Sequence, residues 1–276
     1  MNFTSTAPIL VLGGRGKTGR RVVARLTDLG LPVRAASRSA SAHHSSLARF
    51  DWDDPGTWAS TLDGAGAVYI VFPNEHPDIA TVQAFAAAAA DGGVRRLVLL
   101  SARDADYAGE PFAERAVRES GLEWTILRPS WFAQNFSEGL FAGAVQAGEL
   151  ALPTGEGREA FVDAEDIADV AVAALAQDGH AGQVYELSGP RPLSFGTAVS
   201  MIAESSGRSI RYRHVEPAAY AAELATWGVP ADLADILARL LEAIGHGSGD
   251  YVSDGVQRAL GREPRAFEEY VKAAWT

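Results

Sequence analysis

Short segments rich in Val, Ile and Leu alternate with longer amphipathic segments through the first half of the chain. This alternation constrains the fold most strongly, because it is typical of parallel strands joined by crossover helices. The pattern predicts strands at residues 9–14, 33–38, 48–52, 67–73, 95–102 and 123–129. It predicts helices near residues 17–29, 56–63, 77–91 and 111–120. The first, fourth and fifth strands are almost continuously apolar, which indicates burial on both faces of a sheet.

The alternation loosens after Pro129. The remaining sequence predicts a hairpin at "GELALPTGEGREAFV" and a strand at each of "QVYELSG" and "IRYRHVE". It predicts helices near residues 133–147, 194–206, 217–226 and 230–244, and in "DAEDIADVAVAALAQ", "SDGVQRAL" and "AFEEYVKAAW". We therefore expect an α/β fold, with a Rossmann-type doubly wound parallel sheet in residues 1–132 and a smaller C-terminal α+β substrate lobe in residues 133–276. Residues 160–188 are expected to return to the core sheet.

Composition limits the classes of function. The net charge of −11 argues against a nucleic-acid partner, because phosphate binding needs clustered Lys and Arg. The absence of Cys excludes disulfides and thiolate chemistry, and the six His lack ligand spacing, so we expect no metal site. No apolar run approaches the ~20 residues of a membrane span, and the residues before Pro8 do not resemble a secretory signal. We expect a cytoplasmic enzyme, either a monomer or a homodimer, with no membrane partner.

The segment "PILVLGGRGKTGRRVVARL" contains two candidate phosphate-binding patterns. A triphosphate loop requires Gly, four residues and then Gly-Lys-Ser/Thr, but Val11 stands where the first glycine should be. Three glycines spaced three residues apart instead form G-x-x-G-x-x-G between a buried strand and an amphipathic helix. This arrangement predicts a dinucleotide pyrophosphate bound at the helix N-terminus. The predicted contacts in this loop are Gly13, Gly14, Gly16, Thr18 and Gly19.

The second predicted strand indicates which dinucleotide binds. NAD-selective sites place Asp or Glu near the end of this strand to hold the ribose 2′-hydroxyl, whereas here the strand ends in Ser37 and Arg38. Arg38 can pair with a 2′-phosphate, and Arg15 or Lys17 in the glycine loop can add a second positive charge. We therefore expect NADP(H), with solvated surface cations as the alternative interpretation.

The segments "LVLGGRGKTGRRV", "FDWDDPGTW", "SGLEWTILRPSWFAQNF" and "FVDAEDIADVAVAAL" together resemble the NmrA-like branch of the atypical short-chain dehydrogenases/reductases. Within that branch the chain is most similar to the group of bacterial NAD(P)H-dependent reductases and ergot-alkaloid iminium reductases of secondary metabolism. The resemblance implies that Asp51 and Trp52 flank the adenine and that Phe72 and Pro73 lie along the ribose and pyrophosphate. It implies that the residues near the nicotinamide are Ser101, Pro129, Ser130, Trp131 and Phe132.

A substrate pocket for a small flat or apolar molecule is predicted from a set of mainly aromatic residues. The set comprises Tyr107, Phe112, Trp131, Phe132, Asn135, Phe136 and Trp227. For Trp131, Phe132 and Phe136, packing in a hydrophobic core is the alternative.

Candidate proton donors are few. Ordinary short-chain dehydrogenases use Tyr-x-x-x-Lys, but none of the seven tyrosines here is followed by Lys four residues later. Tyr107 is the nearest phenol to the expected nicotinamide, yet a lone Tyr is a weak acid and could equally be a pocket wall. Ser101 is a second candidate. Glu114 could orient a substrate cation or act as an acid, although we expect an exposed helical carboxylate there.

These observations favour an NADPH-dependent reductase of an activated acceptor: an imine or iminium ion, a quinone or an enone. Such acceptors do not need the Tyr-Lys pair, and binding and orienting the reactants can itself lower a barrier by several kcal/mol. A non-catalytic NADP(H)-binding redox sensor is one alternative. An NADP-binding enzyme repurposed for isomerisation or cyclisation is another.

Overall fold

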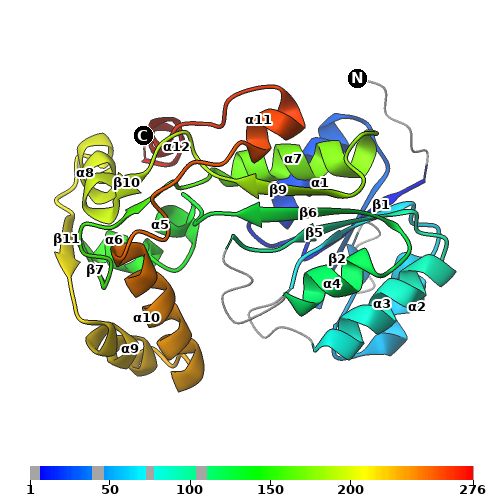
Figure 1. Ribbon diagram of the computed structural model, residues 1–276, viewed down its shortest axis with the longest axis horizontal. Coiled ribbons are helices and arrows are strands. Elements are labelled where there is room, and N and C mark those ends of the chain that lie inside the picture. Colours follow the sequence, from blue (N-terminus) through cyan, green and yellow to red (C-terminus); the bar gives the residue numbers. More distant parts are fainter. Residues whose placement is uncertain (1–6, 39–46, 73–77, 104–110, 276) are drawn as a thin grey trace. The chain divides into compact units, whose positions relative to one another are not determined.

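The computed structural model describes residues 7–38, 47–72, 78–103 and 111–275 (Figure 1). The chain divides into two compact units. Unit 1 comprises Met1–Pro129, Ala164–Leu187 and Asp254–Arg262, and unit 2 comprises Ser130–Asp163, Ser188–Ser253 and Glu263–Thr276. Asp254–Arg262, expected in the C-terminal lobe from the sequence, therefore belong to unit 1. This short segment contacts the last strand of the unit 1 sheet and the helix that precedes it.

Unit 1 contains a seven-stranded sheet in which every neighbouring pair is parallel. In spatial order the strands are β3 (Leu47–Arg49), β2 (Val33–Ser37), β1 (Ile9–Leu12), β4 (Ala67–Ile70), β5 (Arg96–Leu100), β6 (Glu123–Pro129) and β9 (Gln183–Leu187). The chain proceeds outward from β1 in one direction and then from β4 in the other. This arrangement confirms the predicted Rossmann-type doubly wound sheet, and it makes the C-terminal ends of β1 and β4 a natural ligand site.

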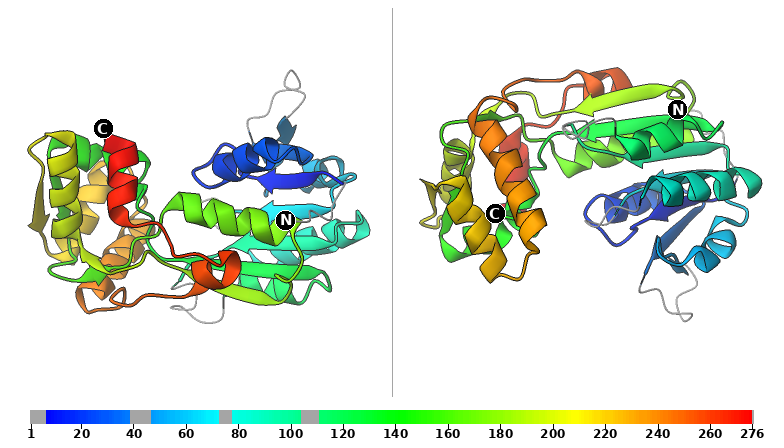
Figure 2. Two further views of the ribbon diagram at one scale, coloured as in Figure 1. Left: turned by 90° about the horizontal axis from the view of Figure 1, so that it is seen from above. Right: turned by 60° about the horizontal axis from the view of Figure 1, so that its bottom comes forward.

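Helices cover both faces of this sheet, as Figures 1 and 2 show. One face carries α1 (Gly19–Asp28) and α7 (Ala164–Ala176), and the other carries α2 (Trp58–Leu62), α3 (Ile79–Asp91) and α4 (Phe112–Arg118). The short 3-10 helix η1 (Pro55–Thr57) precedes α2, and α11 (Gly255–Leu260) lies beside β9. β1 and β4 are buried along their whole length, as their apolar sequences predict.

An ion-pair network joins α1 to α7. Arg21 Nε donates to Glu165 Oε1 at 2.6 Å, and Arg25 binds both Glu165 and Asp169. Arg262, just after α11, donates to Asp169 Oδ2 at 2.6 Å and to the fully buried Asp166. The network therefore fixes the helix that begins at the glycine loop, and it ties the 254–262 segment to unit 1.

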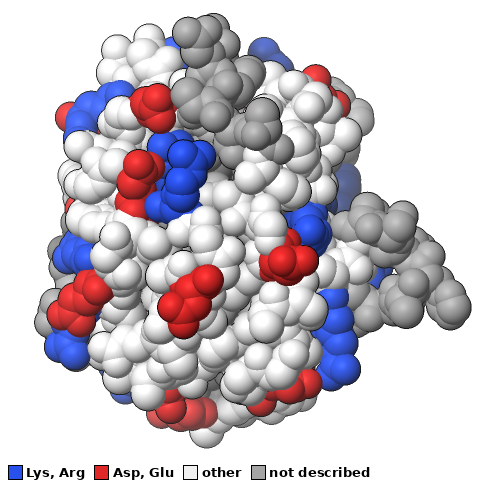
Figure 3. Space-filling view, turned by 90° about the vertical axis from the view of Figure 1, so that its right-hand side faces the viewer, with Lys and Arg blue, Asp and Glu red and all other residues white. Residues whose placement is uncertain are grey.

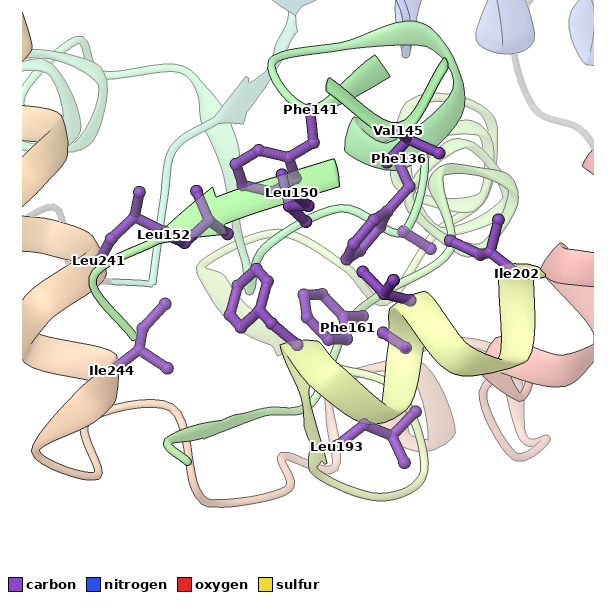
Figure 4. Close-up of a cluster of buried hydrophobic side chains, with 14 of the residues drawn as sticks. Phe136, Phe141, Val145, Leu150, Leu152, Phe161, Leu193, Ile202, Leu241 and Ile244 are labelled. Atoms are coloured by element: carbon purple, nitrogen blue, oxygen red, sulfur yellow. The ribbon is translucent and has the colours of Figure 1, made fainter. Parts of the chain in front are cut away.

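Unit 2 contains six helices and two small sheets in its described residues. The helices are α5 (Asn135–Glu138), α6 (Ala142–Ala147), α8 (Phe195–Ser206), α9 (Pro217–Thr226), α10 (Ala231–Gly245) and α12 (Phe267–Trp275). The strands are β7 (Glu149–Leu152), β8 (Arg158–Glu159), β10 (Leu193–Ser194) and β11 (Arg211–His214). Five phenylalanines form the centre of the core, which Figure 4 shows in part: Phe136, Phe141, Phe161, Phe195 and Phe267.

The prediction of a hairpin at residues 148–162 is wrong. β7 pairs in parallel with β11, and β8 pairs with β10, so the two strands of the expected hairpin have different partners. The connecting loop is held elsewhere: Tyr212 Oη donates to the Gly155 carbonyl at 3.1 Å, and a Cβ at Gly157 would lie 2.2 Å from the Ile244 carbonyl oxygen. These contacts come from segments distant in sequence, so the local turn signals could not reveal them.

Charged side chains on the face shown in Figure 3 are interspersed, and neither sign forms a continuous patch among the described residues visible there. No helix in the described part of the chain combines the length and apolar character needed to cross a bilayer.

Candidate active site

The glycine loop between β1 and α1 forms a close-fitting backbone cradle. Gly13 has φ +61°, a conformation that favours glycine, and its carbonyl accepts a hydrogen bond from Gly16 N at 2.8 Å. A Cβ on Gly14 would lie 2.7 Å from Ala35 Cβ, and one on Gly19 would lie 2.2 Å from the Gly13 carbonyl oxygen. Glycine at these two positions thus allows the loop to pack closely against β2 and against its own backbone. Its geometry fits a dinucleotide at the N-terminus of α1.

Basic residues surround the beginning of α1. Burial, together with the nearby charges of Arg21 and Arg20, lowers the pKa of Lys17 to about 8. Arg15 is exposed. The positive charge of Arg21 is paired with the Glu165 carboxylate in the ion-pair network that joins α1 to α7. A bound phosphate would relieve the repulsion among these cations, so the charge distribution favours an anionic ligand. Thr18, the residue before α1, is buried and lies within the same loop.

The end of β2 also fits the predicted cofactor. Ser37 is its last residue, and the Ser37 hydroxyl oxygen is buried with no hydrogen-bond partner among the described residues. Arg38 follows and is exposed, so no acidic side chain stands at the end of this strand. A phosphate oxygen near this position would satisfy the Ser37 hydroxyl, whereas the site lacks the carboxylate that NAD-selective sites use.

Trp52, one of the predicted adenine contacts, is buried in the core of unit 1. Trp52 is 7% exposed, and its ring packs against Phe50, Trp58, Phe72 and Phe85. The Asp51 carboxylate accepts a hydrogen bond from Asp53 N at 3.2 Å. Trp52 therefore has a structural role in the unit 1 core, and contact with the adenine stays a prediction for it, Asp51 and Phe72. Pro73 lies outside the described residues.

Glu114 is the clearest correction to the sequence-based predictions. It is fully buried rather than exposed, and its carboxylate accepts hydrogen bonds from Ser101 Oγ at 2.7 Å and from Arg128 Nε and Nη2 at 2.7 and 2.8 Å. Arg118 contributes a further contact at 3.1 Å. Two guanidinium groups and a hydroxyl therefore donate to this carboxylate, and its oxygens are engaged by partners within unit 1.

The same network defines what Ser101 can do. Ser101 directly follows β5, and its backbone N–H donates to the Leu127 carbonyl at 2.8 Å. Because its hydroxyl proton is directed to Glu114, the remaining lone pairs of Ser101 Oγ can only accept hydrogen bonds. In this arrangement Ser101 can orient a donor group at the C-terminal end of the sheet, and a catalytic role for Ser101 stays a prediction.

Arg128 was missed in the sequence-based site. Its signal is a single charge within the otherwise apolar strand segment "WTILRP". A charged side chain there must have a partner when the strand enters a buried sheet. Glu114, on the adjoining α4, is that partner, and Arg103 after β5 is a second largely buried cation in this region, 5% exposed.

The structure describes all but one of the remaining predicted site residues. Tyr107 lies outside the described residues, and Phe112 is an exposed residue at the start of α4. In unit 2, Phe136 is a core residue with no exposed surface, so the alternative interpretation holds for it. Trp131 stacks on Phe141 with 5.8 Å between ring centroids. Contact with the nicotinamide stays a prediction for Pro129 and Phe132, and a place in the substrate pocket stays a prediction for Phe132 and Asn135. Trp227 lines a pocket in unit 2.

The doubly wound sheet and glycine cradle define a dinucleotide-binding protein of the Rossmann class. The family model described as NAD(P)H-binding matches residues 13–178. An uncharacterised oxidoreductase of Bacillus subtilis, YesF, is 36% identical over 96% of this chain and 94% of its own. An NAD(P)H azoreductase of Xenophilus azovorans is 32% identical over 96% of this chain and 97% of its own.

The chain belongs to the NAD(P)H-binding family, and it is an oxidoreductase. Its relatives include both bacterial and ergot-alkaloid enzymes, which confirms the resemblance drawn from the sequence. Among solved structures, the quinone oxidoreductase QOR2 of Escherichia coli, crystallised with NADPH, matches 97% of this chain and 100% of its own at 23% identity with a TM-score of 0.81. This last similarity shows the fold.

Proposed function

We propose that the protein is an NADPH-dependent reductase that delivers hydride to an activated small-molecule acceptor: an imine or iminium ion, a quinone or an enone. The observation that carries the proposal is the glycine cradle at the start of α1, where side chains are excluded at Gly14 and Gly19. When bound there, the dinucleotide supplies the hydride.

The preference for NADPH follows from charges at two places. Three cations surround the N-terminus of α1: Arg15, Lys17 and Arg20. β2 ends at Ser37 and is followed by Arg38, where an NAD-selective site would have a carboxylate. Both places favour the additional phosphate of NADPH.

The preference for an activated acceptor follows from the proton donors. The Glu114 carboxylate accepts hydrogen bonds from Arg128, Arg118 and Ser101, so it is engaged within the protein. The sequence has no Tyr-x-x-x-Lys. An iminium ion needs no proton at the carbon that receives hydride, and a reduced quinone can take its protons from water. The residues of this site then bind, orient and exclude water, which suffices for such acceptors.

The relative from Xenophilus azovorans supports this proposal, since it is named for the reduction of azo compounds with NAD(P)H.

Transfer of deuterium tests the proposal. The protein is incubated with NADPH deuterated at nicotinamide C4 and with a panel of cyclic imines, quinones and enones. We expect NADPH oxidation with at least one acceptor class, and deuterium on the carbon of an imine or enone product. Tight NADPH binding without oxidation by any acceptor would refute the reductase and favour a redox sensor.

A further inference from the structure

Unit 2 contains a pocket of about 440 Å³ whose lining residues all belong to this unit. It is lined by residues of α6, β7, β11 and α9 and of the segments that adjoin α6 and α9. Phe141, Leu150 and Leu152 contribute apolar surface, and all three belong to the buried core shown in Figure 4. Both the volume and the apolar lining are typical of sites for small organic molecules.

Three residues of α9 and its C-terminal end give the pocket a specific chemistry. Tyr220, Glu223 and Trp227 are spaced three and four residues apart, so they lie along one side of the helix. Tyr220 is buried, whereas Trp227 is 58% exposed. Leu140, 36% exposed, is a further large apolar residue of the lining. The lining therefore combines a buried phenol ring, a carboxylate and an accessible indole.

Two glutamates line the pocket, and only one of them forms an ion pair with a residue that the structure describes. Glu149 accepts a hydrogen bond from Arg213 Nε at 2.8 Å and also pairs with Arg211. Glu223 makes no ion pair with any residue that the structure describes, and its charge acts on the neighbouring Tyr220. The acidic side chain still open to a ligand is therefore Glu223, and it lies between two aromatic residues on α9.

We propose that this pocket binds a small aromatic cation, with the positive nitrogen at Glu223 and the aromatic group against Trp227. Indole and phenol rings attract cations through their negative faces, and a carboxylate beside them adds a direct charge interaction. The apolar surface of Phe141, Leu150 and Leu152 accommodates the remainder of the ligand. Because this site needs neither cofactor nor hydride transfer, it goes beyond the proposed function.

The test compares benzyltrimethylammonium with neopentylbenzene, its neutral isostere, by calorimetric titration of the protein without NADPH. We expect the cation to bind at least tenfold more tightly than the isostere. Glu223→Gln should weaken binding of the cation about tenfold and leave the isostere unchanged. The matched control is Glu216→Gln, an exposed glutamate immediately before α9 that does not line the pocket, and it should bind the cation like the wild type.

Equal affinities for cation and isostere, or an unchanged affinity in Glu223→Gln, would overturn the proposal. Circular dichroism and NADPH affinity establish that each variant is folded, so a loss of cation binding cannot be confused with unfolding. Trp227→Ser provides a second measurement and should weaken cation binding three- to tenfold. If Trp227→Ser instead converts a dimer to a monomer in sedimentation and the cation does not bind, the pocket is an interface for a second copy and the proposal is wrong.

Discussion

Glu114→Gln tests the most unexpected feature of the site. The carboxylate is fully buried and accepts hydrogen bonds from Arg128, Arg118 and Ser101. The substitution keeps the shape of the side chain but removes its charge and replaces one acceptor with an NH2 donor. That donor faces groups that are themselves donors, and the Arg128 guanidinium, whose side chain is 15% exposed, loses its partner.

The burial of Glu114 and the exposure of its partners set the expected loss in the free energy of unfolding. Breaking a buried ion pair by removing one partner destabilises a protein by about 3–5 kcal/mol. The remaining amide oxygen still accepts from one donor, and Arg118, with 37% of its side chain exposed, can turn to solvent. We therefore expect a loss of roughly 2–4 kcal/mol in the free energy of unfolding. In a chain of this size that corresponds to a fall in Tm of roughly 5–15 °C.

Urea denaturation followed by circular dichroism measures the effect. The matched control is Glu119→Gln on the same helix, where the carboxylate is 58% exposed and lies 3.8 Å from Arg115 Nε. That exposed pair is worth at most about 0.5 kcal/mol. If Glu114→Gln proved as stable as Glu119→Gln, the account of Glu114 as the buried structural partner of Arg128 would be refuted.

Three further predictions concern the cofactor. Gly19→Ala should weaken NADPH binding at least tenfold in a fluorescence titration, because its Cβ would displace the Gly13 carbonyl, whereas Gly196→Ala, whose nearest contact would be an ordinary 3.5 Å, should not. Burial lowers the pKa of Lys17 to about 8, so its cation is lost as the pH rises through this value, and NADPH affinity should fall about tenfold between pH 7 and pH 9. Lys17→Met should abolish this dependence, and a slope retained in that variant would assign it to another group. Arg38→Asp should reverse the preference between NADPH and NADH, and an unchanged ratio would show that Arg38 does not read the 2′-phosphate.

The sheet was predictable because its signals are local. Apolar runs such as "ILVL" and the glycine spacing reveal a buried strand and a phosphate loop without reference to the rest of the chain. The predicted hairpin failed because the partner of β7 is β11, about 60 residues later, and nothing in the turn sequence encodes that pairing. The sequence-based expectation for Glu114 failed because a carboxylate on a helix is usually exposed. Its burial depends on Arg128 of β6 and Ser101 after β5, which are not its neighbours in sequence.

The other site residues illustrate the same limit. Phe136 belongs to an aromatic sequence segment that fits a pocket as well as a core, and only its contacts with Phe161 and Phe267 decide for the core. Glu223 carries no sequence signal of its own. Its significance comes from the pocket that α6 and β7 complete.

The dissociation constants of NADPH and NADH, measured side by side on the wild-type protein, test the central claim most directly. The cradle at Gly14 and Gly19 predicts that both dinucleotides bind, and the cations around α1 with Ser37 and Arg38 predict that NADPH binds at least tenfold more tightly, or about 1.4 kcal/mol. Equal constants, or tighter binding of NADH, would contradict the assignment.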